Sequence, residues 1–187
     1  MADPKDLHRR ALEHFGELVR SVRDDQWSSQ TPCDGWDVRT LVNHLTAENL
    51  WMPPLLAGGT IAEVGSALDG DVLGEDPKRA WDDSAAGAAR AVAEVRLDRT
   101  VHLSYGDVPA RHYVNEVFTD LAIHGWDLAR GIGADETIDP EFVELIYAHA
   151  APHERDMKAS GLFGPTVTPP EGADLQTRLL AVFGRVA

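Results

Sequence analysis

An aspartate and a histidine stand on the apolar face of a predicted helix in the second half of the chain. Apolar residues recur at helical spacing over 109–133, and Asp120 and His124 fall in the middle of this arc. Because they are four residues apart, their side chains lie on the same face. A buried carboxylate needs a partner, and a divalent metal ion bound by both side chains would provide one. The pair therefore predicts two metal ligands, although hydrogen bonds within the pair or to an arginine would satisfy the same pattern.

His44 is the strongest candidate for a third ligand. It lies on the flank of the apolar stripe of a second predicted helix, 37–52, and so faces a helix–helix seam. Glu48 follows one turn later and could orient His44, act as a base or serve as a further ligand. Glu116 lies on the same side of the later helix as Asp120 and is a second candidate base. Two histidines and one carboxylate would leave coordination positions open, which is typical of catalytic metal sites.

The other histidines and the cysteine carry weaker signals. His149 and His153 are also four residues apart, but the surrounding helix is polar, so we expect a solvated face there. Cys33 stands in a turn with no basic group near it in sequence to lower its pKa, which favours a buried structural thiol over a nucleophile. Four further histidines have no partner pattern and are expected at the surface or at helix ends: His8, His14, His102 and His112.

The elements that must position these residues are helices. Three of them are expected to begin at an Asp–Pro pair, because aspartate caps a helix and proline is tolerated at the first helical position. Apolar spacing and turn formers predict helices over 4–22, 37–52, 77–95, 109–133, 140–158 and 175–183. Pro53 and Pro54 should kink or end the second helix. Residues 57–77 should be irregular, and residues 100–105 should form a short strand or hairpin arm. The prediction is an all-α bundle of about four main helices with short extra helices, in a single domain over 1–187.

The composition argues against several classes of partner. The chain has 187 residues, with 31 acidic against 17 basic side chains and a formal net charge of −14. Nucleic-acid backbones and anionic lipid surfaces both attract clustered lysine and arginine, so we expect neither as a partner. One cysteine, the lack of a membrane-length apolar run and a charged N-terminus without a signal core together predict a cytoplasmic protein. Five tryptophans could fill a core or a homodimer interface, and the sequence does not separate the two.

Two central motifs resemble those of a known family. The run TPCDGWDVR over 31–39, followed by His44, resembles the opening motif of mycothiol-dependent maleylpyruvate isomerase N-terminal-domain proteins, which belong to the DinB-like metalloenzyme superfamily. The run DLAIHGWDLAR over 120–130 matches the second signature of that group. The tail, with FGP at 163–165 and GR at 184–185, matches a short actinobacterial subgroup. The resemblance thus covers essentially the whole chain.

The resemblance implies a DinB-like four-helix bundle with a divalent metal, often zinc or nickel, at one end. In the family a histidine of the second helix and an acid-x-x-x-His pair of a later helix bind the metal, and these correspond to His44, Asp120 and His124. The family also implies mycothiol as a thiol cosubstrate. The isomerase proper, however, has a further C-terminal domain that helps hold its dicarboxylate substrate, and it has a glutamate in place of Asp120. Maleylpyruvate isomerisation itself is therefore not the expected activity.

Together, the residues and the resemblance predict a metal-dependent enzyme that activates a low-molecular-weight thiol for transfer to, or isomerisation of, a small electrophile. The physical basis is that a divalent cation lowers the pKa of a thiol that it coordinates. Two alternatives stay open from the sequence. One is a non-catalytic protein that binds a metal or a small ligand, and the other is a metal-dependent hydrolase whose open position holds water.

Overall fold

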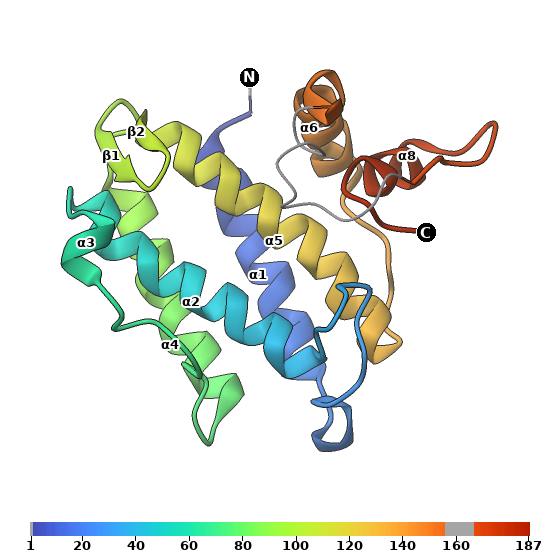
Figure 1. Ribbon diagram of the computed structural model, residues 1–187, viewed down its shortest axis with the longest axis horizontal. Helices are drawn as coiled ribbons and strands as arrows, with labels where there is room; N and C mark the ends of the chain where they lie inside the picture. Colours follow the sequence, from blue (N-terminus) through green and yellow to red (C-terminus); the bar gives the residue numbers. More distant parts are fainter. Residues whose placement is uncertain (1, 156–166) are drawn as a thin grey trace.

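Four long helices pack side by side in the computed structural model of the chain, which describes residues 2–155 and 167–187 (Figure 1). These helices are α1 (Pro4–Ser21), α2 (Val38–Leu56), α4 (Pro77–Glu94) and α5 (Ala110–Ile132). The shorter elements are η1 (Asp24–Gln26), α3 (Ile61–Val64), β1 (Thr100–Leu103), β2 (Gly106–Pro109), α6 (Pro140–Ala150), η2 (Ala151–His153) and α8 (Leu175–Val182). The predicted all-α four-helix bundle with short extra helices and one hairpin is confirmed.

Local capping sets where several of the helices begin and end. Asp3, Asp76 and Asp139 each accept a hydrogen bond from a backbone amide of the first turn, and the proline after each takes the first helical position. Asp37 caps α2 by accepting from the amide three residues later. At the end of α5, Gly133 adopts φ = +69°, a left-handed conformation that costs glycine little. These signals are local, which is why the sequence predicted these boundaries.

The bundle closes because each long helix packs against two others. α1 contacts α4 and α5, and α2 contacts the same two helices. Their apolar faces meet in one core, where the rings of Phe15 and Trp81 pack with centroids 4.6 Å apart. Burying a large apolar side chain contributes about 1.5–3 kcal/mol, so the shared core fixes how α2 and α5 face each other. α6 and α8 pack against each other beside α5, outside the four-helix bundle (Figure 1).

The predicted strand is one arm of a hairpin that leads into α5. β1 and β2 pair antiparallel, with Val101 opposite Val108 and His102 opposite Asp107. Val101 is fully buried, and the hairpin contacts both α2 and α5. The hairpin therefore anchors the N-terminal end of α5 to α2.

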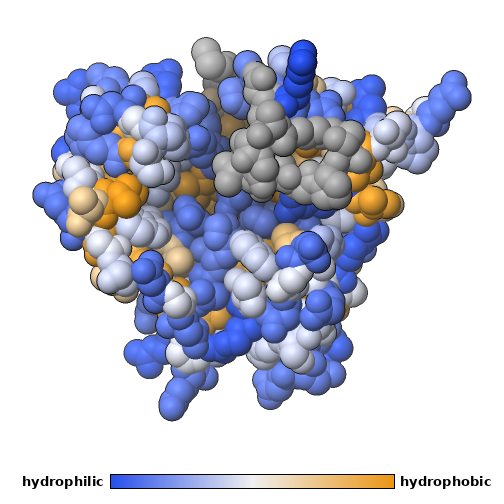
Figure 2. Space-filling model, viewed as in Figure 1, coloured by the Kyte–Doolittle hydropathy of each residue, from blue (hydrophilic) through white to orange (hydrophobic). Residues whose placement is uncertain are grey.

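The surface accords with the acidic composition. Figure 2 shows a face that is mostly hydrophilic and interrupted by small hydrophobic areas. No helix in the described part of the chain has the length and apolar content needed to cross a membrane.

Two predicted boundaries need correction near the prolines of α2. The helix does not end before them but continues to Leu56, because the amides of Ala57 and Gly59 bond the two proline carbonyls and close the last turn. The stretch expected to be irregular contains α3. Its capping box, formed by Thr60 and Glu63, is a signal that the sequence carries.

The helix predicted over 140–158 is also interrupted. α6 stops at Ala150, and the 3-10 turn η2 follows with Pro152 in its middle. Proline lacks the amide that an α-helix needs at this point, so the regular helix cannot continue. The end expected near Lys158 lies outside the described residues.

His8 is buried, whereas the sequence predicted it at the surface or at a helix end. Its side chain is 1% exposed, and neither ring nitrogen has a hydrogen-bond partner among the described residues. It follows Leu7 on the apolar side of α1, whose buried arc is wide enough to include it. Burial lowers the pKa of His8 to about 4 and keeps the ring neutral.

Candidate metal centre

The seam between α2 and α5 brings the three predicted ligands together. His44 Nε2 lies 3.0 Å from Asp120 Oδ2, and His124 Nε2 lies 3.4 Å from Asp120 Oδ1. One ligand atom from each of the three residues falls within 4.8 Å of the other two. The side chains of His44 and Asp120 are 32% and 36% exposed, so solvent reaches the group. Two imidazole nitrogens and one carboxylate oxygen at this spacing could hold a zinc- or nickel-like divalent ion with positions left for other ligands.

An indole ring covers the two histidines. Trp36 stacks on His124 with centroids 5.8 Å apart and packs against His44 at 5.1 Å. The turn before α2 holds Trp36 in place: Thr31 Oγ1 donates to the Trp36 carbonyl, and Gly35 adopts φ = +75°. The first sequence motif therefore builds an aromatic wall that restricts both imidazoles.

The neighbouring histidines keep the Asp120 carboxylate ionised. Burial favours the neutral acid, but His124 and His44 outweigh this and hold the pKa of Asp120 below its ordinary value. A cation is bound by the ionised form of a carboxylate. Asp120 is thus in the protonation state that a metal ligand requires.

The two candidate bases have different surroundings. Glu48 is half-buried one turn beyond His44, and burial, followed by the charge of Asp120, raises its pKa. Glu116 is exposed, accepts a 2.5 Å hydrogen bond from the Tyr105 hydroxyl and lies 3.3 Å from His112 Nε2. The structure therefore brings Glu48 into the electrostatic field of the ligand group, while Glu116 contacts the hairpin and the first turn of α5.

A second cluster lies on the other edge of the His124 ring. Asp127 Oδ2 is 2.9 Å from His124 Nδ1, and Arg185 donates to both Asp127 oxygens, at 2.8 and 3.3 Å. The Cys33 thiol donates to Asp127 Oδ2 at 3.2 Å, and its sulfur accepts from Arg185 Nη2 at 3.4 Å. Cys33, His124 and Asp127 form a second group with ligand atoms within 4.8 Å of one another.

The charges of this second cluster already balance. Burial opposes the charge on Asp127, but His124 and Arg185 hold the pKa of Asp127 below its ordinary value, and Asp127 in turn raises the pKa of Arg185 against the effect of burial. Burial and then the charge of Asp127 raise the pKa of the Cys33 thiol to about 12, so the thiol stays protonated. A cation could bind here only by displacing Arg185 and deprotonating Cys33. The group of His44, Asp120 and His124 is therefore the better candidate metal centre.

Arg185 and Cys33 are the residues that sequence reasoning did not assign to this region. Cys33 has no basic neighbour in the sequence, yet Arg185 contacts it across 152 positions. The signal that pointed to Arg185 was the tail motif at 184–185. The FGP part of that motif lies outside the described residues. His149 and His153 are exposed, as expected, with ring centroids 6.0 Å apart.

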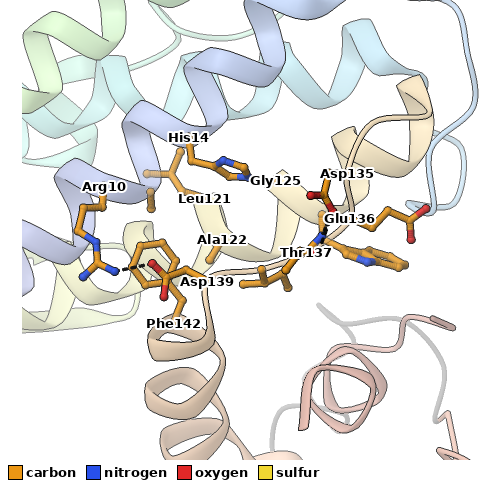
Figure 3. A pocket seen from close by; sticks show the side chains of 13 residues that line it. Arg10, His14, Leu121, Ala122, Gly125, Asp135, Glu136, Thr137, Asp139 and Phe142 are labelled. Atoms are coloured by element: carbon orange, nitrogen blue, oxygen red, sulfur yellow. Dashed lines mark hydrogen bonds and ion pairs between the residues drawn. The ribbon is translucent and has the colours of Figure 1, made fainter. Parts of the chain in front are cut away.

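A pocket of about 170 Å³ lies on the opposite face of α5 (Figure 3). Leu121 and Gly125 line it from α5, and these positions point away from the face that carries Asp120. Across its rim, Arg10 pairs with Asp139. This pocket is a largely apolar seam between α1, α5 and the start of α6, separate from the candidate metal centre.

Comparison with known proteins connects this geometry to a family. A model of the mycothiol maleylpyruvate isomerase N-terminal domain matches residues 8–129, which include the first central motif, all of the second except Arg130, and all three candidate ligands. Two uncharacterized proteins of Mycobacterium tuberculosis, from strains CDC 1551 / Oshkosh and H37Rv, are each 31% identical over 152 residues, covering 80% of this chain and 79% of theirs. Crystal structures of the mycothiol-dependent maleylpyruvate isomerase and of a histidine-to-alanine mutant superpose with TM-scores of 0.59 and 0.61, at 16% identity. These superpositions cover 79% of this chain and 68% of the isomerase, and they show a shared fold.

Proposed function

Because the chain belongs to the mycothiol maleylpyruvate isomerase N-terminal domain family, we propose that it is a metal-dependent enzyme acting with a low-molecular-weight thiol of the mycothiol type. The enzyme transfers the activated thiol to a small electrophile, or uses it to isomerise that electrophile. The observation that carries the proposal is the group of His44, Asp120 and His124, whose ligand atoms lie within 4.8 Å of one another, with the side chains of His44 and Asp120 partly exposed to solvent.

In this proposal, His44 Nε2, His124 Nε2 and the Asp120 carboxylate hold the metal. Two neutral imidazoles and one carboxylate suit zinc, with nickel as the second choice. When bound, such an ion lowers the pKa of a thiol that it coordinates. Asp120 provides the negative charge of the site, and Trp36 holds both imidazole rings against rotation.

We assign the role of general base to Glu48. It lies one helical turn from His44, half-buried and within the field of Asp120, where it can take the proton that the thiol loses. Glu116, the other base predicted from the sequence, already accepts from Tyr105 and faces His112. Its role in the proposal is to hold the hairpin against α5.

The proposal treats residues 1–187 as one domain. Arg185, beyond α8, pairs with Asp127 of α5, so the C-terminal elements contact the bundle at the candidate metal centre. This contact supports a single folding unit.

Metal analysis of the purified protein tests the site. We expect stoichiometric zinc or nickel in the wild type and its loss in His44→Ala and His124→Ala, measured by inductively coupled plasma mass spectrometry. His102→Ala is the matched control, because His102 also pairs with an aspartate, Asp107 at 2.8 Å, but in the hairpin. If His44→Ala and His124→Ala keep the wild-type metal content, the site assignment is wrong.

Product analysis tests the reaction. The metal-loaded protein is incubated with mycothiol and a panel of small electrophiles, and the products are separated and weighed by mass spectrometry. A thiol conjugate or a thiol-dependent isomer of unchanged mass supports the proposal. A cleaved substrate would support hydrolysis instead, and ligand binding without turnover would support a non-catalytic carrier.

A further inference from the structure

His124 makes polar contacts on both edges of its ring. Nε2 faces Asp120 at 3.4 Å, and Nδ1 faces Asp127 at 2.9 Å. An ionised carboxylate accepts hydrogen bonds but has no proton to donate, so the proton of the contact with Asp127 is on Nδ1. A neutral imidazole with its proton on Nδ1 presents its lone pair at Nε2. Asp127 therefore selects the tautomer in which Nε2 can serve as a ligand.

Arg185 holds Asp127 in turn. Its guanidinium makes two contacts with the carboxylate, and its Nη1 donates to the Phe183 carbonyl at 2.6 Å. The side chains of Asp127 and Arg185 are 0% and 12% exposed. Because a two-point contact between guanidinium and carboxylate fixes both orientation and distance, Asp127 cannot rotate away from His124 without breaking a desolvated ion pair.

On the basis of the metal centre in the proposed function, we propose that Asp127 is a positioning residue for His124 and that Arg185 clamps Asp127. The segment 183–185 is then part of the metal centre. Coupling between two sites is reciprocal. Metal bound at His124 therefore stabilises the docking of the C-terminal segment, and docking strengthens metal binding.

Zinc affinity measured by chelator competition tests the two roles. In Asp127→Asn only one of the two side-chain positions is still an acceptor. The amide NH2 group therefore faces either Arg185 Nε, at the Oδ1 position, or the donors His124 Nδ1 and Arg185 Nη2, at the Oδ2 position. We expect zinc to bind about 10–100-fold more weakly than in the wild type. Arg185→Gln should lose about 10-fold, and Arg185→Lys should recover part of that loss, because lysine keeps the charge without the two-point contact.

Arg130 provides the matched control. It also tethers the C-terminal segment, since its Nη1 donates to the Val186 carbonyl at 2.5 Å, and it packs over the Trp126 ring at 4.5 Å. In the part of the chain that the structure describes, it also pairs with Glu136 at 3.0 Å and makes no hydrogen bond or ion pair with Asp127. We expect Arg130→Gln to keep wild-type zinc affinity. If Arg130→Gln and Arg185→Gln weaken zinc binding equally, zinc affinity depends only on docking of the C-terminal segment, and the proposed clamp on Asp127 is wrong.

Two further readouts separate positioning from docking: the tautomer of His124 reports positioning, and hydrogen exchange reports docking of the C-terminal segment. Nitrogen-15 NMR of the metal-free protein should show His124 protonated on Nδ1 in the wild type and partly on Nε2 in Asp127→Asn. Hydrogen exchange of the amides of 179–187 should slow on zinc addition in the wild type, and this slowing should shrink in Asp127→Asn.

Equal zinc affinity in folded Asp127→Asn and wild type would overturn the inference. A wild type that binds no zinc would refute the proposed metal centre instead, and the NMR tautomer, which needs no metal, would still test the positioning role. Circular dichroism identifies variants that are folded. If Asp127→Asn does not fold, the zinc affinities of wild type, Arg185→Lys and Arg185→Gln give the same test, because the clamp predicts that they fall in this order. Equal affinities in the three proteins would contradict the clamp.

Discussion

The two edges of the His124 ring present the same chemical groups in opposite settings. On the Nε2 edge, Asp120 is 36% exposed and lies between two imidazoles. On the Nδ1 edge, Asp127 is 0% exposed and is paired with Arg185 at 2.8 Å. Each edge contains an aspartate, and each aspartate belongs to a group of three side chains able to bind a metal.

Charge balance and solvent access, more than residue type, therefore distinguish a carboxylate that can bind a metal ion from one that only holds a ligand in place. A carboxylate neutralised by arginine has little attraction left for a cation, and displacing the arginine would leave a buried charge unpaired. A carboxylate that lies between two imidazoles, as Asp120 does, keeps its charge and can bind a cation from solvent.

Asp120→Asn should have the largest effect, because it removes the charged ligand from the exposed edge. We expect zinc affinity to fall by more than about 100-fold, beyond the loss typical for residues that only support a ligand. Chelator competition measures the change. Asp107→Asn is the control, since Asp107 also pairs with a histidine, His102, in the hairpin. Unchanged zinc affinity in Asp120→Asn would mean that the metal binds at another site.

Zinc addition should stabilise the folded wild type. At free zinc about 100 times its dissociation constant, binding contributes about 2.7 kcal/mol, which raises Tm by about 5–10 °C in a domain of this size. Differential scanning calorimetry measures the shift. Asp120→Asn should show little shift under the same conditions, and an equal shift in that variant would mean that the ion binds elsewhere.

His8 extends the comparison to a histidine whose two ring nitrogens have no hydrogen-bond partner within residues 2–155 and 167–187. The unfolded chain takes up a proton near pH 6.5, whereas burial lowers the pKa of His8 in the folded protein to about 4. Stability is therefore complete above pH 6.5 and is lost as the pH falls towards 4. The His8 contribution should be about 2 kcal/mol less favourable to folding at pH 5 than at pH 7.

Urea denaturation of the wild type and His8→Leu at both pH values measures this contribution. The variant should lose less stability on acidification than the wild type. His112→Leu, at a side chain that is 46% exposed, serves as the control and should keep the wild-type difference. Identical pH dependence in His8→Leu and the wild type would contradict the role of His8.

Cys33→Ala should have the smallest effect on metal binding. The thiol belongs to the buried edge and stays protonated, so its removal should leave zinc affinity within about 3-fold of the wild type, which is less than the loss expected at Asp127. The lost hydrogen bond to Asp127 should cost about 1 kcal/mol of unfolding free energy. Chelator competition and urea denaturation measure the two quantities. Loss of zinc in Cys33→Ala with retention in Asp120→Asn would reverse the assignment of the two edges.

Much of the fold could be predicted because its signals are local. The Asp–Pro starts at Asp3, Asp76 and Asp139 act within one helical turn, and the structure confirms all three. The errors around the end of α2 came where two local signals, a helix breaker and a helix former, lie close together in the sequence. α2 continues through its prolines because later amides close its last turn, and α3 forms from a capping box within a glycine-rich stretch.

By itself, the sequence determined that Asp120 and His124 share a helical face and that His44 faces a seam, because helical periodicity fixes direction over a few residues. It did not determine that Arg185 reaches Asp127 across 58 positions, or that Cys33 contacts both of them. Nor did it show that His8 is buried. Such contacts depend on how whole helices pack, and packing is decided by the shared core and not by any local pattern. The tertiary structure alone therefore distinguished the edge of His124 that faces the partly exposed Asp120, where we propose the ion, from the edge that faces the buried Asp127.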